Sequence, residues 1–155
     1  MTITERIRHL LESNQIDFKE IDHLETRTCE ESAEARGEEL KYGGKTILFK
    51  DKSDYRLFVI SAALQIDNNK VRKILGSQKL RFATHEELMN LAGVESGALP
   101  PFGRDILPYD LYLDESIVQN EIICFNAGLL TKSFIMKTEE YLNLNDYKVC
   151  QFAKD

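Results

Sequence analysis

The sequence predicts an α/β (α+β) fold, in which short helices surround a curved, mixed, barrel-like β-sheet within a single domain spanning residues 1–155. Three observations lead to this prediction. Capping signals begin several short helices, β-rich runs separate those helices, and no linker, repeat or low-complexity tract divides the 155 residues. A chain of this length can bury most of its apolar surface in one core, and elements mixed in this order favour helices packed on a sheet.

The first elements are marked by helix caps. Two capping boxes, Thr-x-x-Glu at 2–5 and at 28–31, predict helix N-termini, because each side chain of a box bonds the other residue's free backbone amide. Apolar residues at helical spacing extend the first helix to about Ser13, and Gly37 supplies the stop of the second. Between them, apolar side chains among charges at 17–23 predict a short strand.

A β-hairpin and a helix follow. The β-rich runs 46–50 and 56–61 are joined by four polar residues at 51–54, which is typical of a hairpin. Asp67 then begins a helix with one apolar face, and Gly76 ends it. The later elements are expected to be a strand at 80–83, a helix capped by Thr84-x-x-Glu87 and ending at Gly93, strands at 111–113, 122–126 and 134–137, a helix at 138–142 and a closing strand at 147–152.

Positive charge is concentrated in the middle of the chain. The formal net charge is −6, yet residues 41–81 hold 10 basic and 3 acidic side chains. Such asymmetry suggests one positive face on an acidic body. That face would suit a few phosphates at an RNA end, with salt-dependent binding. The alternative is that these side chains are solvated over several faces of the protein.

The cysteines and the apolar runs indicate the compartment. Cys29, Cys124 and Cys150 are odd in number and far apart, and we interpret them as free thiols of a reducing cytoplasm. No apolar run reaches the roughly 18 residues of a membrane span, and the N-terminus lacks the pattern of a secretory signal. We expect a cytoplasmic protein without membrane association, and a monomer, because no coiled-coil pattern or long apolar stripe is present.

Several common catalytic machineries are not indicated. His9, His23 and His85 have no Asp, Glu or Cys partner at metal-ligand spacing, which argues against a zinc site. The Gly-x-Ser-x-Gly motif of a nucleophile elbow does not occur. The segment 43–46 resembles the end of a Walker loop, but Glu39 takes the place of its first glycine and a strand follows. No metal and no cofactor are expected.

Three segments carry candidate site residues. Gly43-Gly44-Lys45 opens an apolar strand with mobile backbone and a cation, which suits a phosphate or a polar ester, although many surface strands begin with lysine. Gly97 and Pro101 bound a Gly-x-x-x-Pro loop whose backbone N–H groups can turn toward a ligand. A simple turn between helix and strand is the alternative for that loop. Asn126-Ala127-Gly128 ends the strand predicted at 122–126.

In this order and spacing, the three segments resemble the aminoacyl-tRNA editing family that is named for YbaK and for the editing domain of prolyl-tRNA synthetase. The resemblance runs from about Thr2 to Leu144. It implies a trans-editing deacylase that hydrolyses the ester between a small mischarged amino acid and the 3′ end of a tRNA. A synthetase pocket discriminates one methylene by only about 1–3 kcal/mol, so a second check is useful. Misacylated tRNA is the implied partner, and a synthetase is a candidate partner.

The resemblance also implies catalytic roles, which we assign to Lys45, Gly97 and Pro101. Lys45, with Lys50 as the runner-up, matches the family lysine that contacts the terminal adenosine or the phosphates of the tRNA. Gly97 and Pro101 match the loop that orients the ester carbonyl and restricts the pocket. In the family the general base is often a water aided by a ribose hydroxyl of the tRNA, so no side-chain base is required.

The remaining expectations concern substrate binding. Phe102 is the aromatic residue best placed by its proline and glycine neighbours to stack on a base, and Asn126 either binds the ligand or caps its strand. The chain departs from relatives that carry His-Pro-x-x-Asn at 126–130, so alanyl specificity is not implied. A non-catalytic module that binds an aminoacyl-tRNA end or an aminoacyl-nucleotide is the rival interpretation. The expected substrate-binding residues are Gly44, Lys50, Phe102, Asn126 and Gly128.

Overall fold

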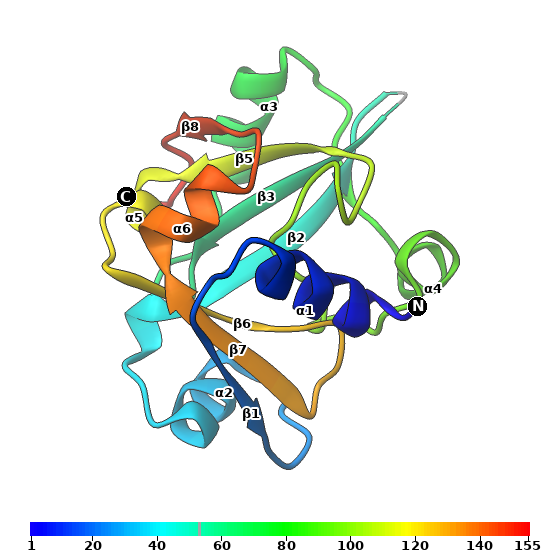
Figure 1. The fold of residues 1–155 in the computed structure, drawn as a ribbon. Helices are drawn as coiled ribbons and strands as arrows, with labels where there is room; N and C mark the ends of the chain where they lie inside the picture. The colour runs from blue at the N-terminus through cyan, green and yellow to red at the C-terminus, as the bar shows by residue number, and fades with distance from the viewer. Residues whose placement is uncertain (53) are drawn as a thin grey trace.

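The computed structural model describes residues 1–52 and 54–155, and it confirms the predicted fold class of mixed helices and strands (Figure 1). The helices are α1 (Ile3–Ser13), α2 (Cys29–Arg36), α3 (Asn68–Leu75), α4 (His85–Ala92), α5 (Glu115–Val118) and α6 (Thr138–Asn143), with a 3-10 turn, η1 (Leu40–Tyr42). The strands are β1 (Phe18–Asp22), β2 (Gly44–Lys50), β3 (Tyr55–Ser61), β4 (Arg81–Phe82), β5 (Asp110–Asp114), β6 (Ile122–Asn126), β7 (Lys132–Lys137) and β8 (Lys148–Cys150).

The strands are divided between two sheets and do not close into a barrel. One sheet has the order β4-β2-β3-β5-β8, and the other has the order β1-β7-β6. The predicted hairpin is confirmed, because β2 pairs antiparallel with β3; Ser53 of its turn lies outside the described residues. A parallel bridge between Gly43 and Cys124 joins the two sheets where β2 begins. Figure 1 shows the three-stranded sheet and α2 in the lower half of the view, with α3 at the top.

Strand β3 lies at the centre of the fold and is buried on both faces. Leu57 and Val59 enter the larger core cluster, whereas Phe58 and Ile60 enter a smaller cluster that includes Val71 of α3. This alternation follows from the geometry of a strand, whose successive side chains point to opposite faces. Burying one such side chain contributes about 1.5–3 kcal/mol. The hairpin therefore gives β2, and the residues at its start, a rigid support.

The predicted helix ends are confirmed. The capping boxes of α1, α2 and α4 are all formed, with both reciprocal hydrogen bonds present. The glycines Gly37, Gly76 and Gly93 end their helices in the left-handed conformation, as the sequence indicated. Helix α5 and turn η1 were not predicted, because four and three residues are too few to show helical periodicity.

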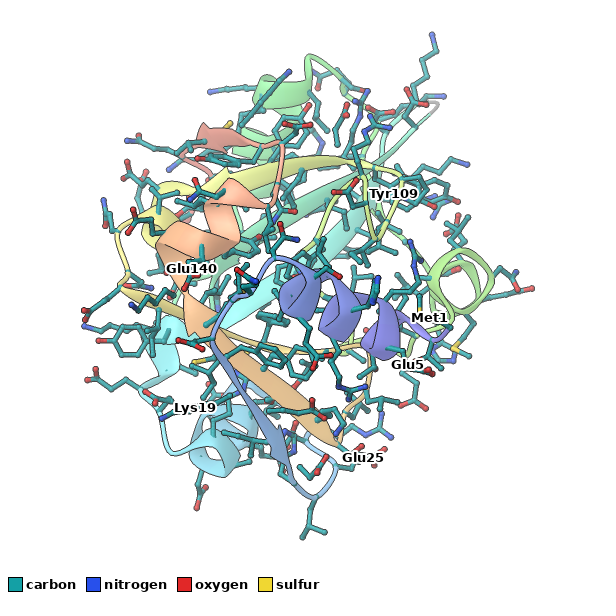
Figure 2. The ribbon with its side chains drawn as sticks, viewed as in Figure 1. Met1, Glu5, Lys19, Glu25, Tyr109 and Glu140 are labelled. Carbon is teal, nitrogen blue, oxygen red and sulfur yellow. The ribbon has the colours of Figure 1, made fainter. Side chains whose placement is uncertain are left out.

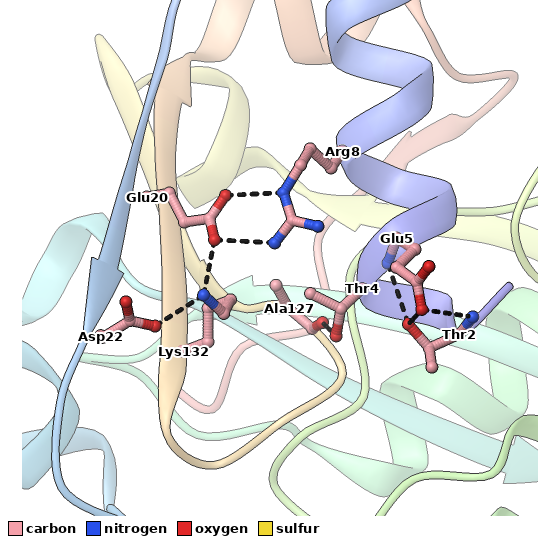
Figure 3. Close-up of polar contacts among 8 residues, drawn as sticks. All are labelled: Thr2, Thr4, Glu5, Arg8, Glu20, Asp22, Ala127 and Lys132. Atoms are coloured by element: carbon pink, nitrogen blue, oxygen red, sulfur yellow. Dashed lines mark hydrogen bonds and ion pairs between the residues drawn. The ribbon is translucent and has the colours of Figure 1, made fainter.

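Helix α1 is fixed to the three-stranded sheet by polar contacts (Figure 3). Arg8 pairs with Glu20 of β1 at 2.7 Å, and Glu20 also accepts a hydrogen bond from Lys132 of β7 at 2.5 Å. The hydrogen bonds from Arg8 and then Lys132 lower the pKa of Glu20 to about 2. The buried Thr4 donates its hydroxyl to the carbonyl of Ala127 at 2.6 Å. These contacts hold the segment that follows β6 against the first turn of α1.

The surface is charged, and part of its positive charge is neutralised. Side chains such as Glu5, Lys19 and Glu25 lie exposed on the outside of the molecule (Figure 2). Within residues 1–52 and 54–155, no helix is long and apolar enough to cross a membrane. Among the described residues of the segment 41–81, four basic side chains pair with carboxylates, so less unpaired positive charge remains than the sequence alone suggested: Lys41, Arg56, Lys70 and Arg81.

Candidate functional site

A cavity of about 270 Å³ opens where β2 begins, between α2, the loop that follows α4 and the end of β6. Lys45 and Gly97, which the sequence analysis assigned to one site, both line this cavity. Two of the predicted substrate-binding residues, Gly44 and Asn126, line it as well. Its walls consist of Thr26, Arg27, Thr28, Cys29, Ser32, Arg36, Gly43, Gly44, Lys45, Thr46, Ile47, Ala62, Ser96, Gly97, Leu99 and Asn126.

Lys45 is positioned by the paired start of β2. Its partner across the hairpin is Ile60, and its ammonium donates to the carbonyl of Leu64 at 2.9 Å. No carboxylate of the described residues pairs with Lys45, so its charge is available to a ligand. The preceding Gly44 allows β2 to approach β6, because a Cβ there would lie 3.0 Å from Cδ1 of Ile123. The glycine therefore has a packing reason as well as a place in the cavity wall.

The loop from Gly97 to Pro101 is held at both ends. Gly97 has a φ of +92°, which favours glycine, and its carbonyl accepts a hydrogen bond from Nδ2 of Asn126 at 2.9 Å. Pro101 is buried and is not among the residues that line the cavity, and its carbonyl accepts a hydrogen bond from the hydroxyl of Tyr141 at 2.5 Å. Burial raises the pKa of Tyr141, so this hydroxyl stays protonated. Pro101 supports the loop and does not face the cavity.

Three predicted binding residues lie outside the cavity lining. Lys50 ends β2, and its ammonium lies 5.3 Å from the ring centroid of Tyr55. The ring of Phe102 is only 1% exposed. It cannot stack on a ligand base without unpacking the core, so Phe102 is a core residue. Gly128, with a φ of +89°, packs against α1, where a Cβ would meet Cγ2 of Ile3 at 2.9 Å.

Arg36, the last residue of α2, lines the cavity and was not among the predicted site residues. Its Nε donates to Oγ of Ser133 at 2.9 Å, and its Nη2 donates to Oδ1 of Asn126 at 3.1 Å. Because Asn126 also bonds Gly97, it connects the end of α2 to the glycine loop. A basic residue in the last turn of a helix commonly complements the helix dipole. The sequence therefore offered no signal that distinguished Arg36 as a site residue.

Thr46 and Cys29 also line the cavity, and their side chains differ in what chemistry they can provide. Oγ1 of Thr46 is buried and has no hydrogen-bond partner among the described residues. Buried polar groups in proteins are nearly always hydrogen-bonded, so this hydroxyl is an exception beside the cavity. Burial raises the pKa of the Cys29 thiol, although the Lys45 ammonium acts in the opposite direction. A protonated thiol is a poor nucleophile, so Cys29 is not a candidate catalytic residue.

The described residues that line the cavity include positive charges and no Asp, Glu or His. Arg27 pairs with carboxylates outside the lining, whereas Arg36 and Lys45 donate only to neutral groups. Such a cavity favours anionic groups. A reaction that needs a base must obtain it from the ligand or from water. In residues 1–52 and 54–155, no group of three His, Cys, Asp or Glu side chains is placed to hold a metal ion.

Comparison with known proteins identifies the family. The family model of the aminoacyl-tRNA editing domain matches residues 23–144, which include every residue that lines the cavity. The chain belongs to the aminoacyl-tRNA editing family. The predicted activity class is confirmed with it: this editing protein is a trans-editing deacylase, a hydrolase that acts on misacylated tRNA.

Relatives of this editing protein include free-standing deacylases and synthetases. It is 31% identical to the multifunctional Ser/Thr-tRNA deacylase ProXp-y of Escherichia coli K12, over 97% of this chain and 92% of that protein. It is 28% identical to the proline–tRNA ligase of Bacillus pumilus, over 68% of this chain and 19% of the ligase. Its fold matches the crystal structure of a protein proposed to be a trans-editing enzyme for prolyl tRNA synthetase, with a TM-score of 0.85, 27% identity, and coverage of 100% and 99% of the two chains. The predicted resemblance is confirmed.

Proposed function

We propose that this editing protein removes a small hydroxylated amino acid, serine or threonine, from the 3′ end of misacylated tRNA. The observation that supports this most directly is the single cavity that Lys45 and Gly97 share. Thr46 lines this cavity, and a substrate hydroxyl that reaches its buried Oγ1 would supply the hydrogen bond that this atom lacks among the described residues. The Escherichia coli relative, whose alignment covers nearly the whole chain, is itself a Ser/Thr-tRNA deacylase.

Each part of the cavity has a role in this proposal. The ammonium of Lys45 binds the terminal nucleotide of the tRNA, where it meets a phosphate. Gly97 presents its backbone to the ester carbonyl, and Pro101 keeps the loop stiff through the hydrogen bond from Tyr141. Asn126 fixes the same loop from the side of β6. Gly44 has no side chain, so it lets the ligand approach the backbone of β2 closely.

The hydrolysis itself needs little from side-chain bases. An aminoacyl ester is already activated, so its hydrolysis requires a positioned water and donors for the developing oxyanion. Among the described residues of the cavity wall there is no carboxylate and no imidazole. We therefore assign the base function to a water assisted by a ribose hydroxyl of the tRNA, as the family resemblance implies.

The same proposal covers the extent of the editing unit, its compartment and its protein partner. Residues 1–155 act as one editing unit, because the alignment with the Escherichia coli deacylase covers 97% of this chain and 92% of that protein. We place this unit in the cytoplasm as a monomer, where charged tRNA is made and used. A prolyl-tRNA synthetase is the candidate protein partner, since the chain resembles a segment of that enzyme.

A deacylation panel tests the function. The purified protein is incubated with seryl-, threonyl- and alanyl-tRNA, and the loss of each ester is followed with time. We expect the two hydroxylated esters to be hydrolysed faster, and Lys45→Ala to lower the rate at least tenfold. Lys154→Ala, which removes an exposed lysine outside the cavity, should leave the rate unchanged. Protection of every ester, or no effect on any, would instead indicate a binding module without activity.

Thr46 supplies a test of the amino-acid class. Thr46→Val removes the hydroxyl and keeps the shape of the side chain. A typical hydrogen bond contributes about 0.5–1.5 kcal/mol, so we expect the preference for seryl- over alanyl-tRNA to fall by roughly 2- to 12-fold. Thr46→Ser retains the hydroxyl and should retain the preference. An equal loss of activity on both esters would argue against contact between Thr46 and the substrate hydroxyl.

A further inference from the structure

Arg36 carries a positive charge that no described residue of the cavity neutralises. Its hydrogen-bond partners, Ser133 and Asn126, are uncharged, and no carboxylate of the described residues contacts it. Burial lowers the pKa of the guanidinium, and the groups that act against this are the thiols of Cys124 and Cys29. An arginine side chain nonetheless stays charged in proteins. A part-buried charge without a counter-ion is unfavourable, so the site favours a ligand that brings a negative charge.

The guanidinium of Arg36 is held along one side, and one of its nitrogens, Nη1, is left without a hydrogen bond among the described residues. Nε and Nη2 are occupied by Ser133 and Asn126, and Ser133 is itself fixed by Nε2 of His23 at 2.8 Å. Nη1 makes no hydrogen bond with a described residue. It lies 3.5 Å from the position that a Cβ on Gly43 would occupy, and Gly43 and Arg36 both line the cavity. Nη1 is therefore a fixed, charged donor at the cavity wall.

We propose that Arg36 is a catalytic residue of the deacylation, and that its Nη1 donates to the oxyanion that develops on the ester carbonyl. The proposal rests on the function proposed above. Two consecutive hydrogen bonds, from Arg36 to Asn126 and from Asn126 to Gly97, place the guanidinium beside the loop assigned to the carbonyl. A phosphate of the bound tRNA is the less favoured ligand, because Lys45 already supplies an unpaired ammonium for it.

The deacylation can be written with Nη1 of Arg36 as the donor to the oxyanion. The oxygen of a water forms a bond to the carbonyl carbon, and the carbonyl π pair moves to the carbonyl oxygen, which becomes the oxyanion bound by Nη1. One water proton passes to the assisting ribose hydroxyl group, which relays a proton onward. The carbonyl bond then re-forms, the bond to the ribose ester oxygen breaks, and that oxygen takes the proton. The products are the free amino acid and a tRNA with an unesterified 3′ end. A charged donor fixed before the reaction stabilises the oxyanion without reorganisation.

Arg36→Gln tests the proposal in steady-state deacylation of the ester that the panel identifies as the best substrate. Loss of one donor to an oxyanion typically costs about 10²- to 10³-fold in kcat. We expect a fall of that size with KM changed by less than about threefold. Arg6→Gln is the matched control, because Arg6 also donates to an uncharged group, the Asp105 carbonyl at 2.9 Å, and lies outside the cavity. Thermal unfolding of both variants establishes that they are folded.

Two further measurements separate a catalytic role from a positioning role. In Arg36→Ala, millimolar guanidinium chloride should restore part of kcat, whereas the same concentration of sodium chloride should not. In an Asn126→Ala background, Arg36→Gln should still lower kcat by at least tenfold. If it has no further effect there, Arg36 acts only by holding Asn126, and the proposal is overturned.

The remaining outcomes are also decisive. A raised KM with an unchanged kcat would assign Arg36 to a phosphate of the bound tRNA and would overturn the oxyanion role. A wild-type protein that hydrolyses no ester of the panel would overturn the proposed function, and this inference with it. An active wild-type protein together with an equally active Arg36→Gln variant would overturn this inference alone.

Discussion

Replacing Gly97 by alanine perturbs the cavity wall without crowding it. A Cβ at this position would lie 3.5 Å from Cδ2 of Leu130, which is an ordinary contact. The cost lies in the backbone, because φ is +92° and a residue with a side chain held in such a region costs about 1–3 kcal/mol. The hydrogen bond from Asn126 that fixes the loop contributes only about 0.5–1.5 kcal/mol. The strain is therefore expected to shift the loop and to break this bond.

We expect Gly97→Ala to lower kcat/KM for deacylation at least tenfold while it lowers the free energy of unfolding by no more than about 3 kcal/mol. Gly93→Ala is the matched control. Gly93 also has a positive φ, +67°, with nothing within 4 Å of an added Cβ, and it lies outside the cavity. It should lose stability in a urea titration but keep its activity. Wild-type kcat/KM in Gly97→Ala, or an equal loss of activity in the control, would refute a role of the loop in orienting the ester.

Three further outcomes are expected. Tyr141→Phe removes the buried hydroxyl that donates to the Pro101 carbonyl at 2.5 Å, so the free energy of unfolding in urea should fall by about 1–3 kcal/mol; an unchanged midpoint would contradict this. Gly128→Ala places a Cβ 2.9 Å from Cγ2 of Ile3 at a φ of +89°, so the thermal midpoint should fall, and a rise would show that α1 does not confine this turn. The folded pKa of Glu20, about 2, lies below its ordinary 4.5, so its ion pairs stabilise fully above pH 4.5 and lose this effect as the pH falls through 2. Glu20→Gln should flatten that part of the stability profile, and parallel profiles would exclude the linkage.

The elements that the sequence predicted well are those with local signals. A capping box and a glycine stop lie within a few residues of the helix end that they define, so α1, α2 and α4 could be placed before the structure was known. The division of the strands between two sheets depends on pairings between distant segments. The bridge between Gly43 and Cys124 is one example, and no pattern within either segment specifies it.

In the site, too, the residues that the sequence predicted are those that belong to short local motifs. Lys45, Gly97 and Asn126 belong to short motifs, and the fold brings all three to one cavity. Arg36 reaches the cavity only because α2 packs beside the ends of β6 and β7, which the sequence does not reveal. Phe102 was assigned to the site from its proline and glycine neighbours. Its burial is decided by rings that other segments supply, as in its edge-on contacts with Phe125 and Tyr141.

The hydrogen bond from Thr4 to Ala127 bears on how far the N-terminus of this protein can be shortened without loss of activity. The family match begins at residue 23, after the end of α1, yet Thr4 of that helix bonds the residue next to Asn126. A truncation that begins at residue 23 would remove this hydrogen bond. It would also expose the apolar side chains on which Ile7 and Leu11 now pack. We therefore expect the minimal active unit to extend further toward the N-terminus than the shared family pattern.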